Sequence, residues 1–183
     1  MNPKSGSILI SEPFLKDSNF SRTVILLCEH NKDGTFGLVM NRKIEEYRLP
    51  DIMPELEALD APLYYGGPVQ PNTLHFLHTR PDLFDDCMLV TDNIYWGGKF
   101  EELTYYISTK QIANDEIRFF IGYSGWGVEQ LEAEIKENTW MVHDGKQVAL
   151  FEDDTEKLWR SVLRDMGGKY KVISNFPIDP SLN

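Results

Sequence analysis

A run of five apolar residues, Val24 to Cys28, constrains the fold of this chain more than any other feature. A strand that is apolar at every position has both faces buried, so other parts of the chain must pack on each side of it. The segment Asn31 to Gly34 then favours a tight turn, because Asn and Asp bond locally and Gly accepts positive φ. Residues 35–40 return as a second strand, so we predict a β-hairpin over residues 23–40.

Short strand-like segments and a few helix-like segments make up the rest of the chain. The predicted strands cover Ser7–Ile10, Leu63–Tyr65, Leu74–Leu77 and Met88–Thr91. Apolar residues at helical spacing predict helices over Phe100–Ile107, Val128–Ile135 and Leu158–Met166. Residues 49–59 contain Pro50 and Pro54, and they predict only a short, interrupted helix.

The order of these segments indicates the fold class. Strands dominate the middle of the chain and the helices come late, without the regular βαβ alternation of parallel sheets. This order favours an α+β domain with a mixed or mainly antiparallel sheet and a few flanking helices. The chain has 183 residues, and no repeat, long linker or change of composition marks a boundary in it. We therefore expect one domain over residues 1–183.

The charge of the chain excludes some classes of partner. Its formal net charge is −11, from 29 acidic and 18 basic residues, and the basic residues are scattered among acids. Such a surface repels nucleic-acid phosphates and anionic lipids, which argues against direct nucleic-acid binding. The apolar stretch near the N-terminus ends at Ser11, too early for a signal peptide or a membrane span. We expect a cytoplasmic protein without membrane association.

Cysteine and histidine residues give little support for redox or metal chemistry. Cys28 and Cys87 are the only cysteines, and in the cytoplasm we expect reduced thiols rather than a disulfide. Cys28 and His30 are two residues apart on a predicted strand and are expected to share a face, as a thiol–imidazole pair would require. With four histidines and no spacing that gathers three ligands, the sequence predicts no metal site and no cofactor.

A glycine-rich segment, Gly122 to Gly127, lies between an apolar strand-like stretch, Ile117 to Ile121, and a helix-like stretch, Val128 to Glu137. This pattern predicts a tight strand-to-helix turn, on which Ser124 would be a candidate nucleophile with backbone N–H groups as an oxyanion hole. The nucleophile-elbow pattern requires glycine two residues after the serine, where this chain has Trp126. The favoured interpretation is a structural turn with Trp126 in the core, and phosphate-loop spacings are absent.

Several motifs, in order along the chain, resemble those of the AlgH/YqgE family. They are Asn19–Val24, Cys28–Asn31, Asp33-Gly34, Gly37, Asn41-Arg42, Tyr65–Pro71, Gly122-Tyr123, Gly125-Trp126, Gln130–Glu132, Glu134-Ile135 and Trp140. The resemblance covers nearly the whole chain. It implies a bacterial α+β domain with a curved, partly barrel-like sheet, in a family without an established biochemical activity. Some members carry a transcriptional-regulator label, although no recognised DNA-binding motif explains it.

Polar and glycine residues in these segments are the candidate binding positions. The predicted hairpin places His30 near its turn and Asn41 with Arg42 at its far end, so the three need not form one site. The pair Gly66-Gly67 before a proline is consistent with a ligand-clasping loop or, as the plainer alternative, with a turn or bulge. The candidates are His30, Asn41, Arg42, Gly66, Gly67, Ser124 and Trp126, and no residue is assigned as catalytic.

The leading hypothesis is therefore a non-enzymatic binding or regulatory module that acts through contacts with an unidentified protein or small molecule. A hydrolase that uses Ser124 is the alternative. A regulator that binds DNA directly is the third hypothesis, and the net charge of −11 opposes it.

Overall fold

The computed structural model describes residues 1–146, 148–151 and 155–178, in which ten strands form one sheet. The strand order is β10-β1-β2-β3-β9-β6-β8-β7, and β5 pairs with both β4 and β9. The strands are β1 (Ile8–Ser11), β2 (Val24–Asn31), β3 (Gly34–Val39), β4 (Lys43–Arg48), β5 (Pro62–Tyr65), β6 (Val69–His78), β7 (Met88–Thr91), β8 (Ile94–Trp96), β9 (Ile117–Trp126) and β10 (Trp140–His143). Among the pairs in these residues, only β5 with β9 is parallel. The predicted α+β fold with a mainly antiparallel sheet is confirmed.

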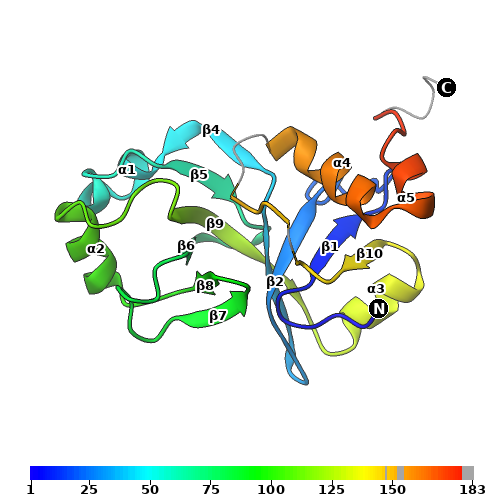
Figure 1. Ribbon diagram of the computed structural model, residues 1–183, viewed down its shortest axis with the longest axis horizontal. Helices are drawn as coiled ribbons and strands as arrows, with labels where there is room; N and C mark the ends of the chain where they lie inside the picture. Colours follow the sequence, from blue (N-terminus) through cyan, green and yellow to red (C-terminus); the bar gives the residue numbers. More distant parts are fainter. Residues whose placement is uncertain (147, 152–154, 179–183) are drawn as a thin grey trace.

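The helices gather toward the two ends of the sheet instead of alternating with its strands. They are α1 (Leu49–Ile52), the short 3₁₀ helix η1 (Pro54–Leu56), α2 (Phe100–Ser108), α3 (Gln130–Lys136), α4 (Thr155–Met166) and α5 (Gly168–Ile173). In Figure 1, α1 lies beside β4 and β5 with α2 below it at the same end of the molecule, whereas α3, α4 and α5 surround β1 and β10. Pro50 lies in the first turn of α1 and Pro54 begins η1, so the interrupted helix is confirmed. Across the described parts of the chain, no helix is both long enough and apolar enough to cross a membrane.

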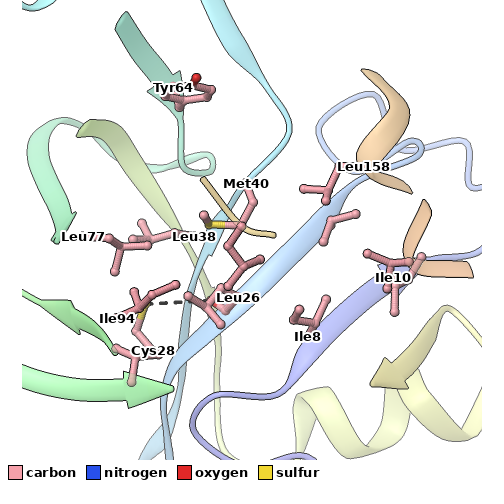
Figure 2. Packing of buried hydrophobic residues seen from close by; sticks show 14 of the residues in the cluster. Ile8, Ile10, Leu26, Cys28, Leu38, Met40, Tyr64, Leu77, Ile94 and Leu158 are labelled. Carbon is pink, nitrogen blue, oxygen red and sulfur yellow. Dashed lines mark hydrogen bonds between the residues drawn. The ribbon is translucent and has the colours of Figure 1, made fainter. Parts of the chain in front are cut away.

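Strand β2 is buried on both faces, as its sequence predicts. Its residues Val24 to Cys28 have no exposed surface. Leu26 and Cys28 belong to a core cluster that α4 completes on one face, while Ile25 and Leu27 pack on the other face with Leu131 of α3. Figure 2 shows Leu26 and Cys28 among the packed residues of the first cluster. Burying each large aliphatic side chain stabilises the fold by roughly 1.5–3 kcal/mol, so this strand is central to folding.

A separate core cluster holds the other end of the molecule together. It joins the inner faces of α2 and η1 to β5 and β9, with Leu103 and Ile107 from α2 packed near Phe119 of β9. The apolar residues of α2 recur at helical spacing, which explains both the helix and its orientation toward the sheet. The long strand β9 passes between the two halves of the molecule (Figure 1) and contributes Phe119 to one cluster and Phe120 to another.

The sheet curves strongly without closing into a barrel. The edge strand β7 comes so close to the segment before β1 that a Cβ atom on Gly6 would lie 2.6 Å from the Val90 carbonyl oxygen. Gly6 has a φ of +83°, a conformation that glycine accepts without strain. Glycine at this position therefore allows the two ends of the curved sheet to approach each other.

The structure corrects two expectations about local geometry. The segment from Gly122 to Trp126 is the end of strand β9, and helix α3 begins only at Gln130. The predicted strand-to-helix turn at 122–127 is therefore wrong. The second expectation is that Cys28 and His30 share a face by simple alternation, but β2 contains a bulge between Leu27 and Glu29. A bulge adds one residue to a strand and reverses the alternation of faces after it.

Candidate functional site

Asn41 and Arg42 hold the segment that precedes β2. The Asn41 side chain accepts a hydrogen bond from the Val24 backbone N–H at 2.9 Å and donates to the Arg22 carbonyl oxygen at 2.9 Å. The Arg42 guanidinium donates to the Ser21 carbonyl oxygen at 2.8 Å. Both side chains thus replace backbone pairing in an irregular segment, where unpaired polar groups would be costly. The hydrogen bonds of these two predicted site residues therefore give them a structural role.

Gly66, Gly67 and Ser124 lie together where two backbone segments cross at close distance. A Cβ atom on Gly67 would lie 2.3 Å from the Tyr123 carbonyl group, and one on Gly66 would lie 2.3 Å from the Gly122 carbonyl oxygen. The Ser124 hydroxyl is fully buried and donates to the Gly66 carbonyl oxygen at 3.1 Å. An attacking serine needs a base and access to substrate. Here the serine hydroxyl joins the two segments.

Trp126 lies in the core beside Trp140. The indole N–H groups of both residues donate to the same carboxylate oxygen of Glu134, Oε2, at 2.9 Å and 2.7 Å. The other carboxylate oxygen accepts a hydrogen bond from Gln130 at 2.9 Å. One glutamate of α3 thereby satisfies two buried indole donors, which fixes α3 against β9 and β10.

His30 does not share a face with Cys28, so a thiol–imidazole pair cannot form between them. Because of the bulge, His30 pairs in register with Thr35, and its Nδ1 lies 2.7 Å from the Thr35 hydroxyl oxygen. Its Nε2 lies 3.5 Å from a carboxylate oxygen of Glu132 in α3. Cys28 remains in the opposite core cluster, where burial raises the pKa of its thiol. The expectation that Cys28 and His30 share a face is wrong.

An open cleft of about 690 Å³ lies between the β2–β3 hairpin and the ends of β6, β8 and β9. We call it the aromatic cleft. It is lined by Glu29, Asn31, Asp33, Gly34, Thr35, Phe36, Val69, Trp96, Tyr123, Gly125 and Trp126. Its volume is within the roughly 300–1,000 Å³ typical of ligand pockets. Of the predicted site residues, Trp126 lines this cleft. His30 lies on the β2–β3 hairpin beside the cleft but is not among its lining residues.

Three partly exposed rings form the apolar wall of the aromatic cleft. The ring centroid of Phe36 lies 4.9 Å from that of Trp96 and 5.0 Å from that of Tyr123. Such tilted ring pairs support each other at little entropic cost, because aromatic side chains have few rotatable bonds. The bulge in β2 does not disturb this wall, since Phe36 and Tyr123 belong to β3 and β9.

His75 packs behind the aromatic wall and lacks a hydrogen bond at one nitrogen. Its ring centroid is 5.3 Å from that of Phe36 and 5.7 Å from that of Tyr123. Within the described residues, its Nε2 is a buried side-chain atom for which no hydrogen-bond partner is found. Burial lowers the pKa of His75, because the charged imidazolium loses solvation in these surroundings. At neutral pH the ring is therefore uncharged.

The charged rim of the cleft is acidic. Glu29 and Asp33 lie on the exposed hairpin, and the residues that line the cleft include no lysine or arginine. The Asn31 amide donates to a Glu29 carboxylate oxygen at 2.6 Å and its oxygen accepts from the Asp33 backbone N–H at 2.8 Å. Asn31 thus orders the turn between the two acids. The cleft combines aromatic surface with negative charge.

The sequence does not predict the aromatic cleft, because β6, β8 and β9, which complete its lining, are far from the β2–β3 hairpin in the chain. One local signal was available: β2 changes from apolar to charged at Glu29, where burial also ends. That change indicates where the strand leaves the core, but it does not identify Trp96 or Tyr123 as neighbours.

Comparison with known proteins places the chain in a family. The model of the AlgH-like family, DUF179, matches residues 8–171. A UPF0301 protein of Cytophaga hutchinsonii is 45% identical over 180 residues, which are 97% of this chain and 98% of the relative. A UPF0301 protein of Chlorobium limicola is 41% identical over 180 residues, or 98% of this chain and 96% of the relative.

Solved structures share the fold over nearly the whole chain. Protein DIP2367 of Corynebacterium diphtheriae has a TM-score of 0.81 at 21% identity, over 96% of this chain and 94% of that one. The AlgH protein of Pseudomonas aeruginosa has a TM-score of 0.72 at 25% identity, over 97% of each chain. The family match, the identities to relatives and the shared fold agree: this chain belongs to the AlgH-like, UPF0301 family.

Proposed function

We propose that the protein is a cytoplasmic, non-enzymatic binding module that recognises a partner through the aromatic cleft. The observation that carries this proposal is the coincidence of a 690 Å³ open cleft, three partly exposed rings and an acidic rim at one place. Exposed aromatic surface is a common feature of recognition sites, because it contributes much contact area at low entropic cost.

The other predicted site residues support this choice by their own contacts. Asn41 and Arg42 order the segment before β2, Ser124 is buried in a backbone crossing, and the Trp126 indole N–H is bonded to Glu134. A nucleophile with an adjacent base would support an enzyme. The Ser124 hydroxyl is buried and donates to a carbonyl oxygen, which suits a structural residue rather than a nucleophile.

A regulatory role would then depend on partner binding rather than on direct contact with DNA. The net charge of −11 opposes association with phosphates, and the cleft adds two carboxylates without a basic lining residue. The two free cysteines, Cys28 and Cys87, are compatible with a reducing compartment.

The test is affinity capture from native lysate with the purified protein as bait, followed by identification of retained proteins and metabolites. The variant Trp96→Ala removes one of the three rings of the apolar wall, and Tyr105→Ala removes an exposed aromatic residue of α2 as a matched control. We expect a retained partner that Trp96→Ala loses and Tyr105→Ala keeps, with both variants folded by circular dichroism. A partner retained equally by all three proteins would refute the cleft as the binding surface. Turnover of a retained metabolite that Ser124→Ala abolishes would favour the hydrolase.

A further inference from the structure

We propose that the aromatic cleft receives an arginine side chain from an extended segment of a partner protein. This inference rests on the proposed function, in which the cleft is the binding surface, and it names the chemistry that the cleft selects. Three properties of the described residues carry it: the charge of the rim, the aromatic wall and the end of β9, where pairing with β6 has stopped.

The rim selects a cation. Glu29 and Asp33 are both exposed acids on the β2–β3 hairpin, and the lining residues include no lysine or arginine. Lys32 of the same turn is exposed and lies outside the lining. Carboxylates bind a guanidinium through paired N–H···O hydrogen bonds, a geometry that suits arginine better than lysine. The net charge of −11 adds a field that attracts cationic partners from solution.

The wall suits a planar cation. Phe36, Trp96 and Tyr123 present partly exposed rings to the same cleft, and a guanidinium stacks on such faces through cation–π attraction. The chain itself shows this contact elsewhere, since the Arg22 guanidinium lies 4.6 Å from the centroid of the Trp159 ring. His75 behind the wall does not oppose a cation at neutral pH, because burial lowers its pKa.

The edge of β9 favours an extended protein segment over a free small cation. Thr35, Phe36 and Gly37 of β3 pair with Trp126, Gly125 and Ser124, so one side of β9 is occupied there. On the other side, β6 pairs with β9 at Val69 opposite Tyr123, and Gly67 lies close against Ser124. Across the described strands, no pairing partner on that side reaches Gly125 or Trp126. An extended chain can bind along an open strand edge while its side chains enter the neighbouring pocket. Gly125 and Val69 both line the cleft at this position.

The experiment uses the full chain labelled with ¹⁵N and a blocked peptide, acetyl-Thr-Val-Arg-Val-Thr-amide, titrated by NMR at low salt. The matched probe replaces arginine with citrulline, which keeps the shape and removes the charge. We expect the arginine peptide to shift amide signals of Gly34 and Gly125 and to bind at least ten-fold more tightly than the citrulline peptide. Equal binding of both peptides, or no shift at the cleft, would overturn the proposal.

Charge variants test the rim without changing its volume. We expect Glu29→Gln with Asp33→Asn to weaken the arginine peptide at least ten-fold. The control pair, Glu45→Gln with Glu46→Gln, removes two charges from exposed positions of β4 outside the cleft and should change affinity less than two-fold. Equal affinity of the rim variant and the wild type would also overturn the proposal.

A single-residue probe, N-acetylarginine methylamide, distinguishes the two sources of a guanidinium. We expect it to bind at least ten-fold more weakly than the peptide, and equal affinity would refute the choice of a protein segment. Failure of all cationic probes, together with a lysate partner that Trp96→Ala loses, would refute arginine recognition alone. The proposed function would fail separately, if cleft variants retained every captured partner.

Discussion

Glu134 provides the sharpest test of how the structure is held together. Its Oε2 accepts hydrogen bonds from the indole N–H groups of Trp126 at 2.9 Å and Trp140 at 2.7 Å, and the two indoles are 6% and 4% exposed. A hydrogen bond to a charged acceptor stabilises a fold by about 1.5–3 kcal/mol, and an abandoned buried donor costs a similar amount. Because Glu134 is partly exposed and water can reach part of the site, we expect Glu134→Ala to lower the free energy of unfolding by about 3 kcal/mol.

Glu134→Gln should cost less, about 1–2 kcal/mol, because an amide oxygen still accepts one hydrogen bond but lacks the charge. The measurement is equilibrium unfolding in urea, followed by circular dichroism and by tryptophan fluorescence. Glu137→Ala removes an equivalent charge from an exposed residue just after α3 and should change stability by less than about 0.5 kcal/mol. A loss below about 1 kcal/mol for Glu134→Ala would refute the shared-acceptor reasoning, since two unpaired buried indole donors should destabilise the fold by more than that.

Three further predictions concern the backbone crossing and the buried histidines. Gly67→Ala would place a Cβ atom 2.3 Å from the Tyr123 carbonyl group at a φ of +150°, and we expect a loss above about 3 kcal/mol in urea unfolding. His75→Phe removes a buried nitrogen without a partner, so we expect a gain of about 1 kcal/mol, and a clear loss would show that the nitrogen is satisfied. Burial lowers the pKa of His75 and His78 from 6.5, so the unfolded chain binds more protons and stability should fall as pH drops below 6.5. The slope between pH 6.5 and 5 should be smaller in His75→Phe, as unfolding at several pH values will show.

The parts of the fold that depend on local sequence could be predicted. Val24 to Cys28 is buried on both faces because a continuous apolar run has no other stable environment. The interruption at Pro50 and Pro54 follows from the geometry of proline itself. The helix predicted over Leu158–Met166 corresponds to α4, Thr155–Met166, because its apolar stripe matches the helical period.

The turn predicted for the glycine-rich segment is wrong because its glycines allow close contact with a backbone segment far away in the sequence. Considered without its spatial neighbours, a glycine-rich segment predicts a turn. Gly122 instead allows β9 to pass close to Gly67, where a Cβ atom on Gly122 would lie 2.4 Å from the Gly67 carbonyl oxygen. No local rule distinguishes a glycine needed for a turn from one needed for the close approach of another backbone.

The bulge in β2 could not be predicted from the sequence either, and it determines which residues line the cleft. Without it, Cys28 and His30 would share a face by simple alternation. With it, Glu29 pairs opposite Phe36 and lines the aromatic cleft, while His30 contacts Thr35. A one-residue irregularity therefore exchanges an imidazole for a carboxylate at the rim and changes the ligand chemistry that the site can offer.

The residues that carry the family resemblance divide into two groups with different uses in experiments. Arg42, Trp126 and Glu134 make hydrogen bonds that maintain the fold, so their variants would lose binding through loss of structure. Glu29 and Asp33 also stand within the matching motifs, yet they are exposed on the hairpin. Replacing them by their amides removes charge and leaves the core clusters intact. Of these two groups, only the second can therefore show whether this cleft is a binding surface.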